Sequence, residues 1–345
     1  MIGTLKNLVS IFNIFRRGED MEDHAMGNDT ATEANTAEVD ITEENDSSTN
    51  TVPKVSIITP AKNEGSNVKM TVDSIIGASS ADIPFEVIVV DDNSQDGCCS
   101  FLLQNTEYWQ ESGVKLLRTT GIGAANARNL GARHATGDIL VFCDAHVLVE
   151  KEWMDKMVAV LSQAGVDVLT PGIADYSNPL RVGFGQTWTE KLETNWLPAP
   201  KEVSPIPLAP GGLEAVKREV FESVGGFETG FKIWGYEDVE LSLKCWLFGF
   251  KVYVTPEVTV KHIFRKRHTY FVSYKEVYYN LIRMALSHFK RERVVKAINM
   301  TKSMPQAEDI LTNIILSNAW EQRREYFNKR KYDDDWFMNK FQIPF

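Results

Sequence analysis

The sequence of 345 residues contains only four cysteines, and these follow no ligand or disulfide pattern. Cys98 and Cys99 are adjacent, while Cys143 and Cys245 lie within apolar runs. Because no Cys-x-x-Cys pair occurs, the spacing argues against the common structural zinc sites and against a disulfide framework. We therefore expect buried free thiols in a reducing compartment.

The chain also lacks a long hydrophobic run and an excess of basic residues. No stretch reaches the roughly 18 apolar residues that a membrane-spanning helix needs. The formal net charge is −10, so the composition shows none of the basic character of a nucleic-acid-binding protein. We expect no nucleic-acid partner and a cytoplasmic location.

The first 53 residues differ in composition from the rest. In residues 1–17, apolar side chains recur at helical spacing between flanking cations, which predicts an amphipathic helix. Such a helix would dock on a partner, on the protein's own surface or peripherally on the cytoplasmic face of a membrane. Residues 18–53 contain eleven Asp or Glu and no Lys or Arg, which predicts an acidic disordered linker.

Strand and helix patterns alternate from residue 54 to about residue 165. The predicted strands are 55–59, 87–90, 114–117 and 139–142, and the predicted helices are 64–77, 96–110, 124–134 and 153–163. This alternation predicts an α/β fold with a Rossmann-like, mostly parallel central sheet flanked by helices.

Prolines interrupt the pattern after residue 165. They predict long loops that shape an acceptor cleft, ending near Pro210. Further helices are expected at 214–224, at 238–248 and through most of 270–325, and a short strand at 252–255.

Polar side chains follow three of the predicted strands. Thr59 ends the first strand, Asp91 and Asp92 follow the second, and Asp144 and His146 follow the fourth. Each group alone is consistent with capping of the next helix. In an open parallel sheet, however, ligands bind beyond the carboxyl ends of the strands, so the three groups together favour a nucleotide and metal site.

The triplet Asp144-Ala145-His146 is the strongest of these signals. Residues i and i+2 of a strand lie on the same side, so the carboxylate and the imidazole can converge on one point. Carboxylate oxygens suit Mn²⁺ and Mg²⁺, and the imidazole favours Mn²⁺.

Two adjacent acids, Glu237 and Asp238, lie where a glycine-containing turn meets a predicted helix. They could complement the helix dipole, or face the cleft as a general base or as a stabiliser of positive charge. Trp234 beside them offers an apolar face for a sugar ring.

A compact set of cationic and hydrogen-bonding side chains follows the last predicted strand. It consists of His262, Arg265, His268 and Tyr270. Such donors suit a pyrophosphate, although a solvated basic turn would have the same composition.

Taken in order, these segments resemble family 2-type glycosyltransferases with an A-type fold, and among them the catalytic domain of polypeptide N-acetylgalactosaminyltransferases. The resemblance covers roughly residues 54–290. The matching motifs are Val55-Ser-Ile-Ile-Thr59 with Asn63-Glu64, Val90-Asp91-Asp92-x-Ser94, Asp144-x-His146, Gly211-Gly212-Leu213, Trp234-Gly235-x-Glu237, and His262-x-Phe264-Arg265-Lys266 with His268 and Tyr270.

The resemblance implies a role for each of these positions. Asp144, His146 and His262 would hold Mn²⁺, or Mg²⁺ in its place, against the diphosphate of a UDP-sugar. Thr59, Asp91 and Asp92 would recognise uridine, and Arg128 would line the nucleotide pocket. Arg265, His268 and Tyr270 would belong to a mobile loop that closes over the diphosphate. The transferred sugar or the acceptor would be contacted by Gly211, Gly212, Trp234 and Glu237.

One position departs from the family pattern. The relatives commonly have Asn after Trp-Gly-Gly-Glu, whereas this chain has Tyr236 before Glu237 and Asp238 after it. Glu-Asp at this place resembles inverting A-fold transferases, in which the Asp is the base. The overall pattern favours retention of anomeric configuration and Asp238 favours inversion.

The expected organisation is a catalytic domain at 54–290 followed by a C-terminal helical extension at 291–345. The expected activity is metal-dependent transfer of a sugar of the GalNAc or GlcNAc type from a UDP-sugar to a hydroxyl, such as Ser or Thr of a peptide or protein. The alternatives are a membrane-associated transferase that builds a polysaccharide or glycolipid, and a catalytically inactive scaffold.

Overall fold

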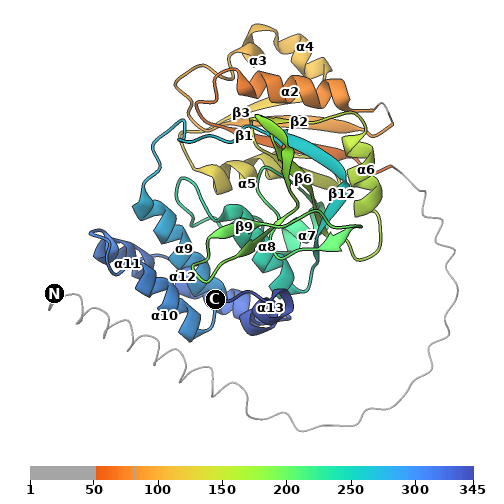
Figure 1. Cartoon of the computed structure of the whole chain (residues 1–345). Coiled ribbons are helices and arrows are strands. Elements are labelled where there is room, and N and C mark those ends of the chain that lie inside the picture. Colours follow the sequence, from red (N-terminus) through yellow and green to blue (C-terminus); the bar gives the residue numbers. More distant parts are fainter. Residues whose placement is uncertain (1–51, 81) are drawn as a thin grey trace, which may run out of the picture. The chain divides into compact units, whose positions relative to one another are not determined.

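A ten-stranded mixed sheet lies at the centre of residues 52–80 and 82–345, which are the residues that the computed structural model describes (Figure 1). Its strands are β1 (Val55–Ala61), β2 (Phe85–Asp91), β3 (Val114–Arg118), β4 (Ile139–Cys143), β5 (Val147–Leu148), β6 (Val168–Asp175), β7 (Asn178–Gly183), β10 (Ser204–Pro205), β11 (Leu213–Lys217) and β12 (Val252–His262). They lie in the order β10–β12–β6–β11–β4–β1–β2–β3, with β5 beside β12 and β7 beside β6. The predicted helix at 1–17 and residues 18–51 of the predicted linker lie outside the described residues.

The half of the sheet that the alternating pattern predicted is parallel. Strands β4, β1, β2 and β3 all run in the same direction. Strand β11 is antiparallel to both of its neighbours, β4 and β6, so the sheet as a whole is mixed. The predicted α/β class with a central sheet flanked by helices is confirmed.

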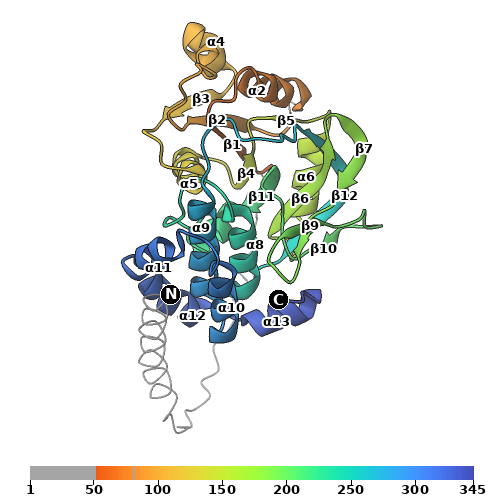
Figure 2. The same ribbon diagram turned by 60° about the vertical axis from the view of Figure 1, so that its left-hand side comes forward.

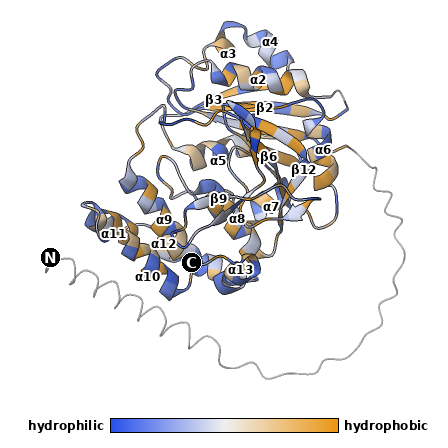
Figure 3. Ribbon diagram, viewed as in Figure 1, coloured by the Kyte–Doolittle hydropathy of each residue, from blue (hydrophilic) through white to orange (hydrophobic). Residues whose placement is uncertain are grey.

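Helices cover both faces of the sheet. One face packs against α2 (Asn67–Ala78), α4 (Thr106–Glu111) and α6 (Trp153–Leu161), and this core includes alternate residues of β1 and β2. The other face packs against α5 (Ala124–His134), α7 (Arg218–Ser223) and α8 (Glu237–Phe248). Figure 1 shows α2 above the β1–β3 part of the sheet and α5 below it, and Figure 3 shows hydrophobic residues concentrated in the strands.

Several predicted helix boundaries were wrong. The helix expected at 64–77 begins at Asn67, because Asn63 and Gly65 have positive φ angles and form a turn. The helix expected at 96–110 is two short helices, α3 (Phe101–Gln104) and α4, which are separated at Asn105. Local side-chain spacing does not reveal such turns.

The helix expected at 214–224 was the largest error. Its first part is strand β11, which pairs with β4 and β6, and only residues 218–223 are helical. The two neighbouring strands provide pairing partners on both sides, and this tertiary pairing overrides the helix propensity of Glu214 and Ala215.

The segment between residues 165 and 262 contains more strand than the prolines suggested. Besides β6, β7 and β10 it contains a two-stranded sheet of β8 (Gln186–Trp188) and β9 (Thr194–Trp196). The short strand expected at 252–255 extends to His262, with an irregularity between Val254 and Thr259 where Pro256 interrupts the pairing.

The C-terminal residues form the predicted helices and pack on the α8 side of the sheet. They are α9 (Tyr274–His288), α10 (Arg291–Met300), α11 (Ala307–Ile315), α12 (Ala319–Lys329) and α13 (Asp334–Phe341). Figure 2 shows α9 beside α8; α10, α11 and α12 pack against α9, and α13 packs against α8. No helix among the described residues is long and apolar enough to cross a lipid bilayer.

Buried charges join α8 to these helices. The Lys244 side chain is completely buried, and its Nζ donates to the Gly226 carbonyl at 2.6 Å and to the Tyr326 hydroxyl of α12 at 3.4 Å. The same Nζ lies 3.2 Å from Glu240 Oε2, and Glu240 Oε1 lies 2.7 Å from His288 Nε2 of α9. The paired charges therefore fix the C-terminal helices to the helix that begins at Glu237.

Candidate functional site

A pocket of about 740 Å³ opens beyond the carboxyl ends of β1, β2 and β4. Its lining includes Asp92 after β2, Asp144 after β4, His262 at the end of β12 and Glu237 at the start of α8. The strand ends of the sheet thus deliver polar groups to one cavity, as the sequence predicted.

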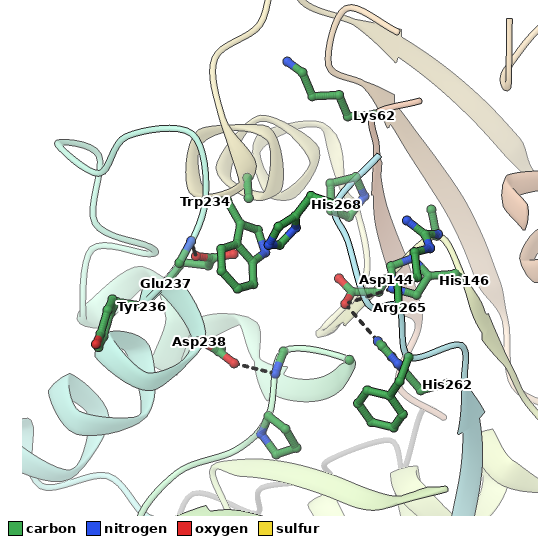
Figure 4. A pocket seen from close by; sticks show the side chains of 18 of the residues that line it. Lys62, Asp144, His146, Trp234, Tyr236, Glu237, Asp238, His262, Arg265 and His268 are labelled. Atoms are coloured by element: carbon green, nitrogen blue, oxygen red, sulfur yellow. Dashed lines mark hydrogen bonds and ion pairs between the residues drawn. The ribbon is translucent and has the colours of Figure 1, made fainter. Parts of the chain in front are cut away.

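Asp144, His146 and His262 form a cluster at the floor of this pocket. Asp144 Oδ2 lies 3.5 Å from His262 Nε2 and 3.9 Å from His146 Nε2 (Figure 4). One ligand atom from each of the three residues lies within 4.8 Å of the other two. A carboxylate and two imidazoles that converge in this way fit a divalent transition metal such as Mn²⁺.

Local structure explains how residues so far apart in the chain converge. The Asp144 amide donates to the Gly212 carbonyl, which joins the end of β4 to the loop before β11. His262 is held by pairing of β12 with Val147 of β5 and Asp175 of β6. A Cβ on Gly212 would lie 3.0 Å from the His262 ring, so any larger residue here would push the imidazole away from its present position.

Arg128 of α5 holds two of the pocket carboxylates in place. Its Nη2 donates to Asp144 Oδ1 at 2.8 Å, and its Nη1 donates to Glu237 Oε1 at 3.1 Å. Burial alone would raise the pKa of Asp144, but the contacts with His262 and Arg128 outweigh it and lower that pKa to about 2. Asp144 is therefore ionised at neutral pH, as a metal ligand must be.

Glu237 and Asp238 lie side by side but in different surroundings. The Gly235 amide donates to Glu237 Oε2 at 2.7 Å, and the Gly211 amide donates to Asp238 Oδ2 at 2.8 Å. Burial raises the pKa of both carboxyls above their ordinary values. Arg128 forms an ion pair with Glu237 and not with Asp238, so no cation among the described residues pairs directly with Asp238.

The segment from Phe264 to Tyr270 forms one wall of the pocket. Arg265 donates both terminal nitrogens to the carboxylate of Glu64, at 3.0 Å for the Nη1 bond. The His268 ring lies edge-on to Trp234, with ring centroids 4.5 Å apart. Burial and then repulsion from Arg265 lower the pKa of His268, which favours its neutral form.

Asp92 also lines the pocket, and backbone and side-chain donors occupy both of its oxygens. Its Oδ1 accepts from the Ile122 amide at 2.6 Å and from the Thr119 hydroxyl at 2.5 Å, and its Oδ2 accepts from the Gly123 amide at 3.1 Å. These donors outweigh burial and lower the pKa of Asp92. The carboxylate therefore fixes the 119–123 loop at the pocket rim.

Most of the predicted site residues line this pocket. They are Asp92, Arg128, Asp144, His146, Gly211, Gly212, Trp234, Glu237, Asp238, His262, Arg265, His268 and Tyr270. Thr59 and Asp91 are not among the lining residues. Thr59 is buried within β1, and Asp91 Oδ1 accepts from the Ser94 amide at 2.9 Å.

Three polar residues near the site received no role from the sequence. Glu64 and Lys62 come from the turn after β1, and both line the pocket. Glu214 of β11 is fully buried, and neither of its oxygens has a hydrogen-bond partner in the described structure. Burial, followed by repulsion from Asp238, raises the pKa of Glu214 well above its ordinary value. The polar run Lys62-Asn63-Glu64 after the first strand was the signal available for the first two.

Two family models match the chain. The model for glycosyl transferase family 2 matches residues 56–225. A second model, described as the N-terminal domain of galactosyltransferase, matches residues 197–269. Together the two matches include the turn after β1, the triplet at Asp144 and the segment that ends at Thr269.

Curated relatives match over much of the same region. Polypeptide N-acetylgalactosaminyltransferase 11 of Xenopus tropicalis is 33% identical over 241 residues, which cover 64% of this chain and 39% of that protein. Polypeptide N-acetylgalactosaminyltransferase 15 of Homo sapiens is 34% identical over 238 residues, which cover 63% and 36%. The chain thus spans about two fifths of the length of these relatives.

Solved structures share the fold. The crystal structure of GalNAc-T7 with UDP, GalNAc and Mn²⁺ aligns with a TM-score of 0.70 at 24% identity, covering 85% of this chain and 57% of that one. TarS residues 1–349 of S. aureus in complex with UDP-GlcNAc aligns with a TM-score of 0.54 at 17% identity, covering 80% and 81%. With the motif residues gathered at one pocket, these matches show that the chain belongs to the family 2-type glycosyltransferases with an A-type fold and resembles the polypeptide N-acetylgalactosaminyltransferases.

Proposed function

We propose that this protein is a metal-dependent glycosyltransferase that moves a sugar of the GalNAc type from a UDP-sugar to a hydroxyl acceptor. The observation that carries the proposal is the convergence of Asp144, His146 and His262 at the floor of a 740 Å³ pocket. A pocket of that size is large enough to hold a nucleotide sugar. Mn²⁺ is the favoured ion, because GalNAc-T7 is crystallised with UDP and Mn²⁺ and the ligand set here suits that ion.

The donor would lie between the metal ligands and the rim of the pocket. Arg265 and Lys62 provide positive charge on the pocket wall, which suits a diphosphate. Trp234 is partly exposed in the lining and provides an apolar ring face for a sugar. Asp92 supports the donor site through the backbone of the 119–123 loop, which its oxygens hold.

The chemistry requires charge stabilisation at both ends of the bond that breaks. When bound, the metal ion would neutralise negative charge that develops on the departing diphosphate. Arg265 would add a guanidinium on the same side. Glu237 and Asp238 lie across the pocket, where a carboxylate stabilises the positive character of the sugar or accepts the proton of the acceptor hydroxyl.

A donor and acceptor panel tests this function. UDP-GalNAc, UDP-GlcNAc and UDP-glucose would be incubated with Mn²⁺ and with Ser- or Thr-containing peptides, glycans or glycolipids, and product would be detected by mass spectrometry. We expect transfer from UDP-GalNAc to a peptide hydroxyl that disappears on chelation of the metal. Transfer only to a glycan or glycolipid would show that the acceptor is not a peptide. If the protein neither transfers a sugar from any of these donors nor hydrolyses any of them, the inactive-scaffold alternative would be correct.

The anomeric configuration of the product assigns the role of Asp238. Proton NMR of the new glycosidic bond distinguishes an α-product from a β-product. A β-product from the α-linked donor would mean inversion, with Asp238 as the base. An α-product would mean retention, and Asp238 would then act as an electrostatic group rather than as an inverting base.

A further inference from the structure

Glu64 lies on a rigid turn at the edge of the pocket. The residues on either side of it, Asn63 and Gly65, have positive φ angles of 54° and 56°. The Asn63 amide donates to Ser94 Oγ at 3.1 Å, and the Gly65 amide donates to Asp96 Oδ2 at 2.7 Å. Backbone bonds on both sides therefore fix the direction of the Glu64 side chain, which is 7% exposed.

Two functional side chains meet at the carboxylate of Glu64. Both terminal nitrogens of Arg265 donate to it in a bidentate pair, across 201 residues of sequence. His146 Nδ1 lies 3.3 Å from Glu64 Oε2, the same oxygen that Arg265 Nη2 contacts. The guanidinium thus lies beside the metal-ligand cluster, although its two terminal nitrogens point to a protein carboxylate.

A second contact ties the same segment to the same turn. Thr269 Oγ1 donates to the Lys62 carbonyl at 3.0 Å, and Lys62 Nζ lies 5.6 Å from the centre of the Tyr270 ring. The segment 263–270 is therefore held to the 62–64 turn at Lys62 and at Glu64. Of these two attachments, the one at Glu64 is an ion pair, with Arg265.

A diphosphate at the metal ligands would need the same donors. Bidentate geometry is the arrangement in which arginine binds phosphate oxygens, and both terminal nitrogens of Arg265 are already engaged by Glu64. The negative charge of the diphosphate would also lie close to the carboxylate of Glu64. If Arg265 moved from Glu64 to the diphosphate, its guanidinium would neutralise part of the donor's charge and so weaken the repulsion between the diphosphate and Glu64.

We propose that Glu64 is a positioning residue that holds Arg265 over the pocket before the donor binds and releases it to the donor's diphosphate. This inference rests on the proposed function, since it requires a nucleoside diphosphate at the metal ligands. Glu64 then competes with the donor for one guanidinium, so removal of its charge strengthens donor binding.

The test is a double-mutant cycle read by binding. UDP affinity would be measured by isothermal titration calorimetry at saturating Mn²⁺ for wild type, Glu64→Gln, Arg265→Ala and the double variant. Mn²⁺ affinity without UDP would be measured separately, from the EPR signal of the free ion, so that saturation is established for each variant. Asp73→Asn is the matched control, because it also removes one negative charge but lies in an exposed pair with Lys69 outside the pocket.

Glu64→Gln should lower the dissociation constant of UDP by about three- to tenfold, and the same change in the Arg265→Ala background should have a smaller effect, because only the direct repulsion between Glu64 and the diphosphate is then removed. Asp73→Asn should bind UDP as wild type does. An unchanged or weaker UDP affinity of Glu64→Gln, or an equal gain in the Arg265→Ala background, would overturn the role of Glu64.

Two further results separate the possible failures. If Glu64→Gln lacks the wild-type thermal transition, Glu64→Asp tests the same point, because it keeps the charge but withdraws it from Arg265; it should also bind UDP more tightly, and an unchanged or weaker affinity would overturn the inference. If wild type with Mn²⁺ does not bind UDP, the proposed function itself is wrong. Wild-type binding with additive effects of the two substitutions would overturn the Glu64 inference alone.

Discussion

Substitution of Arg128 by Met would test whether one guanidinium neutralises the buried carboxylates of the site. The side chain is 5% exposed and donates to Asp144 at 2.8 Å and to Glu237 at 3.1 Å. Loss of one partner of a buried ion pair costs about 3–5 kcal/mol, because the remaining charge is left uncompensated. We expect a loss of that size in the free energy of unfolding, measured by urea denaturation of metal-free protein at pH 7.5.

The pH dependence of the stability loss in Arg128→Met is a second, independent test. Burial already raises the pKa of Glu237 in the folded state, and removal of the cation raises it further. A carboxyl whose folded pKa lies above its unfolded pKa binds more protons in the folded state, so stability rises as the pH falls toward the folded value. The cost of Arg128→Met should therefore be smaller at pH 5.5 than at pH 7.5.

Wild type and a control variant define the comparison. In wild type the pKa of Asp144 is about 2, below its unfolded value, so its contribution is kept across this range and is lost only in stronger acid. Arg133→Met removes an exposed cation from the same helix and should change stability by less than about 0.5 kcal/mol. A cost below about 1 kcal/mol for Arg128→Met, or an equal cost at both pH values, would refute this account.

Three further substitutions separate the metal cluster from its supports. His262→Ala should weaken Mn²⁺ binding by at least about tenfold in the EPR titration. His134 is an exposed histidine of α5, and His134→Ala should leave Mn²⁺ binding unchanged. Equal effects of the two substitutions would show that His262 is not a metal ligand. Gly212→Ala should also weaken Mn²⁺ binding, because the added Cβ would lie 3.0 Å from the His262 ring; wild-type affinity would show that this close contact is not needed. Lys244→Met should lower the free energy of unfolding by about 3–5 kcal/mol, since it leaves Glu240 buried without its ammonium partner, and a loss under about 1 kcal/mol would contradict that pairing.

The sequence predicted the parts of the fold that local patterns encode. The β-branched run at Val87–Val90 and the helix at 124–134 are found as expected, because each is an element that its own residues specify. The triplet at Asp144 also follows a strand and lines the pocket, as expected, but it forms the turn between β4 and β5, so the turn and not the strand period brings its two side chains together.

The failures involve residues whose partners are distant. Glu214 was placed in a helix, because its strand exists only through pairing with β4 and β6. Glu64 received no role, since its contact with Arg265 joins residues 201 positions apart. The two links from Arg128 to Asp144 and Glu237 were missed for the same reason. Local sequence spacing does not predict such pairs, because the arrangement of the strands in the folded sheet brings their members together.

Because His262 lies at the end of β12, the three-residue metal cluster is complete only after that strand has joined the sheet. Strand β12 is the last strand of the sheet in chain order, and it pairs with β6 and β5, whereas Asp144 and His146 follow β4. A nascent chain that has not yet delivered β12 carries two of the three ligands and cannot close the cluster. Cation affinity therefore requires that β12 has already paired with β6 and β5.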